Sequence, residues 1–176
     1  EYSQGLDMEL VLIGAGGHSR SCVDVAEAAG WKIAGFISPN DTDQLYDHFR
    51  LGNDTWLLSW NIPAHIQCLI AVGQIKAATL RRQLYDSLRQ RQISLATVIS
   101  PHAYVSKHAV VADGSVVMHG AVINASAMVA ENCIINSLAL LEHDVTVGTH
   151  THISTGARVN GGVSVGSGVM LGSGSV

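Results

Sequence analysis

Residues 105–122 read VSKHAV, VADGSV and VMHGAV, and this six-residue pattern runs without interruption to Val176. The first position of each hexapeptide is always aliphatic, and the fifth is always small or β-branched. The first positions are Val105, Val111, Val117, Ile123, Val129, Ile135, Leu141, Val147, Ile153, Val159, Val165 and Leu171. A period of six fits neither an α-helix nor a plain sheet, but it is typical of a parallel β-helix with one repeat per flat side. We therefore predict a β-helix over residues 101–176, in which stacked coils bury a continuous core, rather than an ordinary β-sandwich.

The chain before residue 100 has a different pattern, in which short aliphatic runs alternate with stretches of helical character. Strands are predicted at residues 9–13, 31–37, 68–72 and 93–99, and helices at 19–29 and 76–91. Residues 43–67 show no clear pattern. Strand, glycine turn, helix and strand in succession indicate a βαβ unit and a parallel sheet. Residues 8–100 are therefore expected to form an α/β domain that ends at Ser100-Pro101.

Composition excludes several classes of protein. The 176 residues carry a net charge of −4, which disfavours nucleic acid as a partner. No apolar run is long enough to span a bilayer. The three cysteines are scattered at Cys22, Cys68 and Cys133, as expected of a reduced cytoplasmic protein and not of a disulfide framework. Residues 1–7 are polar and contain no signal peptide, and Met8 is the expected natural start.

Two groups of motifs resemble one known family. Gly14-Ala-Gly-Gly-His18 is followed by Val23-Asp-Val-Ala26, and the repeats contain Asn136-Ser-Leu-Ala-Leu-Leu-Glu-His-Asp144 and His152-Ile-Ser-Thr-Gly-Ala157. Over residues 8–176 the chain resembles the sialic acid O-acetyltransferase and nucleotide-aminosugar N-acetyltransferase family. The resemblance implies a small Rossmann-like amino-terminal domain, a left-handed β-helix, and homotrimers that bind acetyl-CoA between adjacent β-helices.

His143 is the candidate catalytic residue. It occupies the third position of its hexapeptide and is expected to point outward, because Leu141 and Val145 face the core. The residues eighteen positions away, Ala125 and Gly161, are small and leave room for substrates. An imidazole can take a proton from an attacking amine or hydroxyl near neutral pH. The resemblance implies that His143 is the general base, that Asp144 raises its basicity, and that no acetyl-enzyme forms.

The resemblance also implies binding residues. Acetyl-CoA is expected to contact His152, Gly161 and Ser173, and the sugar to lie beside Asn136. The diphosphate region of the acceptor is expected to contact Gly16, Gly17, His18 and Gly73. No role is implied for His119 or His150, and no histidines and acids fall at the spacing of metal ligands.

The glycine turn is not a dinucleotide fingerprint. Ser19 stands where the third glycine belongs, and the second strand ends at Phe36-Ile-Ser38 without an acid, so NAD is disfavoured. Free N–H groups at a helix N-terminus nevertheless bind phosphate. Several relatives place an acid after this strand to meet the nucleotide base, whereas here Ser38-Pro39 follows. The identity of the nucleotide therefore stays open, as does whether the acceptor is nucleotide-linked.

The expected function is transfer of an acetyl group from acetyl-CoA to the 4-amino group of a nucleotide-linked dideoxy-aminosugar in surface-glycan biosynthesis. O-acetylation of a sialic acid is the alternative within the same reaction type. A non-catalytic trimeric scaffold that binds nucleotide sugars is the alternative of a different class. The repeats stop at Val176 without a terminal cap, so we expect either that the β-helix is truncated or that disordered residues are missing; a truncated β-helix is expected to bind acetyl-CoA more weakly.

Overall fold

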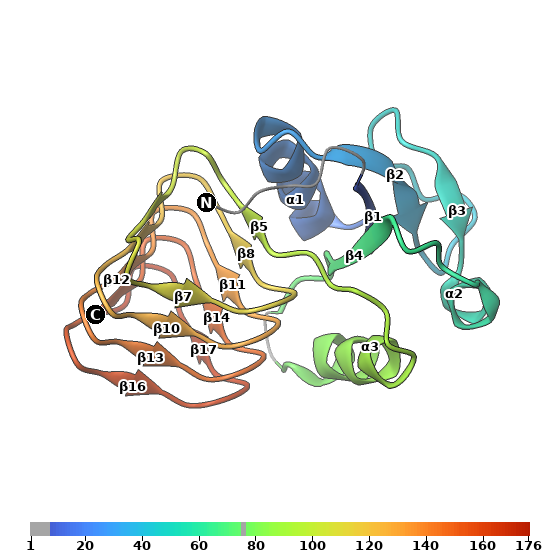
Figure 1. The fold of residues 1–176 in the computed structure, drawn as a ribbon. Coiled ribbons are helices and arrows are strands. Elements are labelled where there is room, and N and C mark those ends of the chain that lie inside the picture. Colours follow the sequence, from blue (N-terminus) through green and yellow to red (C-terminus); the bar gives the residue numbers. More distant parts are fainter. Residues whose placement is uncertain (1–7, 75–76) are drawn as a thin grey trace.

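In the computed structural model, which describes residues 8–74 and 77–176, a small α/β unit lies against one side of a β-helix (Figure 1). The prediction about residues 1–7 therefore lies outside the described residues, as does the predicted helix start at Lys76. The elements of the α/β unit are β1 (Glu9–Ile13), α1 (Gly17–Ala28), β2 (Lys32–Ile37), β3 (Arg50–Gly52), α2 (Asp54–Ser59), β4 (Ile66–Ile70) and α3 (Thr79–Gln90). Its four strands are parallel, in the order β3-β2-β1-β4, as expected of a Rossmann-like sheet.

The expected strand over residues 93–99 is wrong as one element. Only β5 (Val98–Ile99) is a strand, and it pairs with β8 of the β-helix instead of the amino-terminal sheet. Leu95 forms a single bridge to Cys68 at the edge of β4, held by the N–H of Cys68 on the Ser94 carbonyl at 2.9 Å. The segment changes sheets between residues 96 and 98, and so neither sheet receives a full strand.

The β-helix consists of strands of two residues joined by tight turns. After β5 they are β6 (Tyr104–Val105), β7 (Val110–Val111), β8 (Val116–Val117), β9 (Val122–Ile123), β10 (Met128–Val129), β11 (Ile134–Ile135), β12 (Leu140–Leu141), β13 (Thr146–Val147), β14 (His152–Ile153), β15 (Arg158–Val159), β16 (Ser164–Val165) and β17 (Met170–Leu171). They form three parallel sheets, β16-β13-β10-β7, β17-β14-β11-β8-β5 and β15-β12-β9-β6. Each strand pairs with the one eighteen residues on, as Leu141 does with Val159. The predicted left-handed β-helix is confirmed.

The turns at the corners of the β-helix require a left-handed backbone at the fourth position of the hexapeptide. Glycine supplies this conformation at six of the corners from residue 114 onward, and Ser126, Asn132, Leu138, Asp144 and His150 adopt it with φ between 55° and 62°. A non-glycine residue in this region costs about 1–2 kcal/mol. Asp144 therefore occupies a strained position beside His143.

The sheet that contains β5 and β17 carries a second, outward-facing apolar surface. Val98, Val116 and Ile134 point away from the β-helix core, yet none of them is exposed, because α1 packs over them through Cys22 and neighbouring residues. The α/β unit thus covers one of the three faces of the β-helix (Figure 1). His119 adds a polar link at one corner, 2.9 Å from Asp24 of α1.

Gly148 tests how tightly neighbouring coils stack. A Cβ atom there would lie 2.6 Å from the backbone nitrogen of Ser167 and 2.7 Å from the backbone carbon of Gly166 on the next coil, and rotation of a side chain cannot relieve these backbone contacts. We expect Gly148→Ala to lower the free energy of unfolding by about 1–3 kcal/mol, measured by urea denaturation. Gly166 is the matched control: it lies eighteen residues on and a Cβ there would meet only Val169, at 3.8 Å. Equal stability of the two variants would contradict the expectation.

Candidate functional site

His143 and Asp144 form an exposed pair at the corner between β12 and β13. The Nδ1 atom of His143 lies 2.8 Å from Oδ2 of Asp144. Since a carboxylate can only accept, Nδ1–H is the donor, and in the neutral imidazole Nε2 carries the lone pair. The hydrogen bond and the charge of Asp144 raise the pKa of His143, and Glu142 adds to the effect. The pair therefore presents a basic nitrogen to solvent.

Gly161 lies directly beside this basic nitrogen on the next coil. A Cβ atom on Gly161 would be 2.6 Å from Nε2 of His143, so only glycine leaves the lone pair free. The coils are held in register by the N–H of Gly162, which donates to the His143 carbonyl at 2.9 Å. On the preceding coil, Ala125 accepts from the N–H of Asp144 at 3.0 Å.

A separate cleft of about 930 Å³ opens in the α/β unit, at the carboxyl ends of β1 and β4. Ligands of open parallel sheets bind at this edge. Gly16, Gly17 and His18 line it from the start of α1, and Gly73 lines it after β4. No side chain caps α1, so its first N–H groups are available to a ligand.

The imidazole of His18 is neutral in this cleft. Burial lowers its pKa to about 3, helped by the nearby charge of Arg81. A Cβ atom on Gly73 would lie 3.3 Å from the Cβ atom of His18, so the glycine lets the two segments approach. The turn therefore offers hydrogen-bond donors to a ligand without a positive side chain.

His152 and Asn136 lie next to the cleft on the covered face of the β-helix. Nδ1 of His152 is 2.7 Å from the carbonyl of Gln74, and Nε2 is 3.1 Å from Nδ2 of Asn136. The carbonyl can only accept, and the Asn136 oxygen already accepts from the N–H of Ser137 at 2.8 Å. His152 is therefore protonated at Nδ1 alone, and burial lowers its pKa. Within one chain both ring nitrogens of His152 are already engaged.

The sequence-predicted site residues fall into two groups. One contains the cleft residues with Asn136 and His152, on the side that the α/β unit covers. The other contains His143, Asp144 and Gly161, at the corner between the two faces that the unit does not cover. Ser173 lies lower on the β-helix, where its hydroxyl is 3.3 Å from that of Ser154. One chain does not bring the basic histidine to the cleft.

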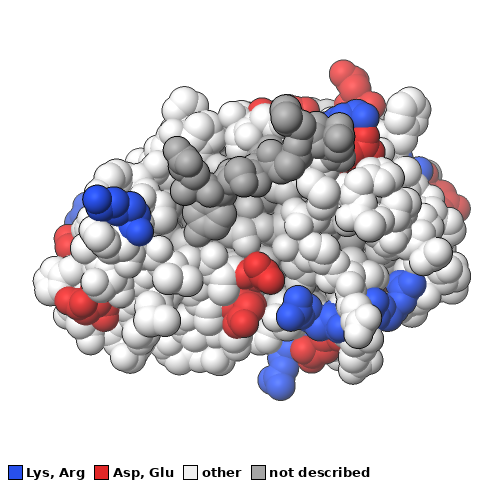
Figure 2. All heavy atoms as spheres, viewed as in Figure 1, with Lys and Arg blue, Asp and Glu red and all other residues white. Residues whose placement is uncertain are grey.

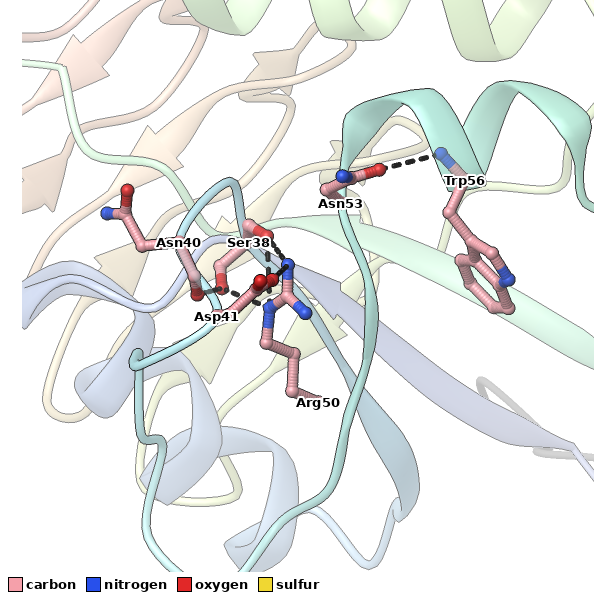
Figure 3. Close-up of polar contacts among 6 residues, drawn as sticks. All are labelled: Ser38, Asn40, Asp41, Arg50, Asn53 and Trp56. Carbon is pink, nitrogen blue, oxygen red and sulfur yellow. Dashed lines mark hydrogen bonds and ion pairs between the residues drawn. The ribbon is translucent and has the colours of Figure 1, made fainter.

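The structure adds an acid to the cleft that the sequence did not reveal. Asp43, in the segment that showed no pattern, lines the cleft together with Asn40, although β2 itself ends without an acid. Arg50 shapes this loop by donating to the Ser38 carbonyl at 2.8 Å and pairing with Asp41 at 2.9 Å (Figure 3). In the same region, Asn53 caps α2 by accepting from the N–H of Trp56 at 2.9 Å (Figure 3).

Arg81 is a second residue whose position the sequence did not predict. Charged residues of an amphipathic helix are expected at the surface, but Arg81 is only 1% exposed. It donates to the carbonyls of Ile70 and Val72 at 2.7 Å and to the Oδ1 atom of Asn132 at 2.6 Å. These hydrogen bonds to backbone carbonyls and to the Asn132 side chain explain the burial, and no sequence signal marks the partners.

The described residues contain no group of three or more His, Cys, Asp and Glu side chains that could hold a metal ion. Across the described ranges no helix combines the length and apolarity that a membrane crossing requires. On the face shown in Figure 2, the described Lys and Arg side chains stand in small groups among acidic ones, without a continuous basic surface.

Comparisons with known proteins agree with both halves of the chain. Residues 9–88 match the family model of the PglD N-terminal domain. The acetyltransferase domain of PglB from Neisseria gonorrhoeae FA1090, in complex with acetyl coenzyme A, is 29% identical with a TM-score of 0.83, over 97% of this chain and 90% of that chain. A mutant of perosamine N-acetyltransferase from Caulobacter crescentus, in complex with CoA and GDP-perosamine, is 27% identical with a TM-score of 0.80, over 94% and 86%.

A more distant structure, WeeI from Acinetobacter baumannii AYE, shares the fold at 14% identity and a TM-score of 0.58, over 96% of this chain and 93% of that chain. No curated protein sequence matches the chain significantly. Residues 9–88 thus resemble the PglD N-terminal domain, and the expected resemblance to the nucleotide-aminosugar acetyltransferases is confirmed over nearly the whole chain.

Proposed function

We propose that this protein is an acetyltransferase that transfers the acetyl group of acetyl-CoA to the 4-amino group of a nucleotide-linked dideoxy-aminosugar. The observation that carries the proposal is the free Nε2 of His143, held by Asp144 and left open by Gly161. The similar structures that hold acetyl coenzyme A, or CoA with GDP-perosamine, support the two substrate classes. A role in surface-glycan biosynthesis and a cytoplasmic location belong to this proposal.

In the proposed reaction, the amine nitrogen attacks the thioester carbonyl carbon, and Nε2 of His143 takes the proton that the nitrogen loses. The C–S bond then breaks, and the proton on His143 passes to the departing thiolate to give the free thiol of CoA. Asp144 stabilises the protonated imidazole meanwhile, through its hydrogen bond to Nδ1. The proposed attack is direct and forms no acetyl-enzyme; the described cysteines are poor nucleophiles for one, because they are buried and burial raises their thiol pKa values.

The complete site requires a second copy of the chain. His143 projects from the corner opposite the covered face, whereas the acceptor cleft and Asn136 lie on that face. We therefore propose a homotrimer in which His143 of one chain meets the cleft of its neighbour. Acetyl-CoA would lie between the β-helices, against His152, Gly161 and Ser173. Exposed apolar side chains on the uncovered faces, such as Tyr104 and Met128, are suited to contacts between chains.

The test of the reaction is release of free thiol from acetyl-CoA with a panel of acceptors. The panel contains UDP-, dTDP- and GDP-linked 4-amino sugars, free sialic acid and CMP-linked sialic acid. Turnover with a nucleotide-linked amine supports the proposal and identifies the nucleotide. Turnover with sialic acid alone would replace it by O-acetylation, and no turnover with any acceptor would favour a non-catalytic scaffold.

Mixed trimers test whether the site is shared between chains. We expect His143→Ala and Gly17→Asp to be nearly inactive when expressed separately, because Gly17→Asp places a carboxylate in the cleft, where a side chain has open space. Co-expressed, the two variants should regain about a quarter of the wild-type activity, since random mixing joins an intact His143 to an intact cleft at one site in four. Absence of recovery in isolated mixed trimers would place the whole site within one chain.

A further inference from the structure

Arg81 is a buried cation without an acidic partner among the described residues. Its guanidinium donates to four neutral oxygens, the carbonyls of Ile70, Val72 and Asn132 and the Oδ1 atom of Asn132, and its Nε atom is buried with no partner among the described residues. The nearby thiols of Cys22 and Cys133 do not offset the charge, because burial raises their pKa values and keeps them neutral. Burial lowers the pKa of Arg81 to about 10, so the guanidinium stays charged near pH 7. Such an uncompensated buried charge is costly.

The charge lies immediately behind the acceptor cleft. Val72, whose carbonyl Arg81 binds at 2.7 Å, is itself part of the cleft wall, as are Gly73 and Leu80. One layer of backbone therefore separates the guanidinium from the cleft. On the other side, Arg81 reaches Asn132 at a corner of the β-helix, so that α3 is fixed to both halves of the chain.

The described lining of the cleft offers no positive side chain to a diphosphate. Among its described lining residues Asp43 is the one formally charged side chain, and His18 is neutral. Among the described lining residues, a diphosphate in this cleft would meet the N–H groups at the start of α1 and a carboxylate, but no cationic side chain. Charge in a low-dielectric interior acts over longer distances than at the surface, since water does not screen it.

We propose that Arg81 is a positioning residue that supplies the positive charge for the diphosphate of the acceptor nucleotide from behind the cleft wall, without touching it. This inference rests on the proposed function, because it assumes a nucleoside diphosphate in the cleft. It explains why α3 keeps a charged side chain at a buried position where its hydrogen bonds reach only neutral oxygens. The same charge helps to keep the imidazole of His18 neutral, so that the turn donates hydrogen bonds without becoming a titrating site.

The test compares binding of a nucleoside diphosphate and its nucleoside to wild type and variants by titration calorimetry. The probes are GDP with guanosine, UDP with uridine and dTDP with thymidine. Arg81→Gln is expected to weaken diphosphate binding on the order of tenfold while nucleoside binding changes less than twofold. Arg81→Lys keeps the charge and should restore most of the diphosphate preference. Arg81→Met, which fills the buried volume without charge, replaces Arg81→Gln should that variant not fold.

Two further readouts separate charge from structure. Asn132→Gly removes the hydrogen bond to Arg81 but keeps its charge, and glycine tolerates the φ of 55°, so this variant should keep the preference. The pKa of His18, followed by NMR, should rise in Arg81→Gln and stay low in Asn132→Gly. If Arg81→Gln weakened diphosphate and nucleoside binding equally, or weakened neither, the inference about Arg81 would be overturned while the proposed function would stand. Wild type that binds none of the three diphosphates would overturn the proposed acceptor as well.

Discussion

His143→Ala should lower kcat by roughly 10²–10⁴-fold, the usual contribution of a general base. The side chain is exposed and makes its one described hydrogen bond to Asp144, so folding and assembly should be unaffected. Thiol release from acetyl-CoA measures kcat, and sedimentation velocity with thermal unfolding checks the fold. His108→Ala is the control, because His108 is an exposed histidine at the same corner of the β-helix, two coils before Asp144, and should keep full activity. Wild-type turnover by His143→Ala would remove this residue from the mechanism.

The pH profile of kcat/KM is a second test of His143 as the general base. The base must be unprotonated, so activity should rise as pH increases through the pKa of His143, which Asp144 holds above its ordinary value. Asp144→Asn removes that charge, and asparagine tolerates the left-handed backbone at this corner. The inflection should therefore move to lower pH in the variant, together with a lower maximal rate. An unchanged inflection would show that another group controls the profile.

Gly161→Ala is expected to reduce activity by at least a hundredfold without unfolding the protein. Its Cβ atom would lie 2.6 Å from Nε2 of His143 and 2.7 Å from Cε1, so the imidazole must turn away from the position that takes the proton. Displacement of a catalytic group by about 1 Å is enough for a loss of this size. The backbone at Gly161 does not need a positive φ, so alanine brings no strain of its own.

The Gly161→Ala experiment has internal controls. Gly166→Ala places a methyl group where it meets only Val169 at 3.8 Å, and should leave kcat unchanged. The double variant with His143→Ala should be no less active than His143→Ala alone, because the methyl group then has no imidazole to displace. A further loss in the double variant would show that Gly161 acts through some contact other than His143.

The repeats made most of the fold predictable, since local register alone decides which way each side chain points. The aliphatic Leu141 and Ile153 are fully buried, and His143 between them on the chain is exposed at a corner. The glycines at residues 14–17 likewise predicted the turn between β1 and α1 that lines the cleft. In these cases neighbours along the chain carry the information.

Contacts between distant segments were not predictable. Asp43 reaches the cleft from a loop shaped by Arg50, and no periodic pattern runs through that loop. The burial of Arg81 depends on carbonyls of β4 and on Asn132, which lies 51 residues further along the chain. The strand predicted over 93–99 failed for the same reason: its residues suit a strand, but two sheets compete for them.

The unbroken eighteen-residue register limits which insertions and deletions the β-helix can tolerate. Deleting one residue between β9 and β12 would send every later aliphatic side chain outward, so such a change is expected to be eliminated by selection. Inserting a whole coil of eighteen residues there would leave each later side chain pointing in the same direction. It would, however, move His143 about 4.8 Å along the axis of the β-helix relative to the coils before the insertion. Changes of length in this half of the gene should therefore concentrate at the corners, where a loop can grow without altering the phase of the coils.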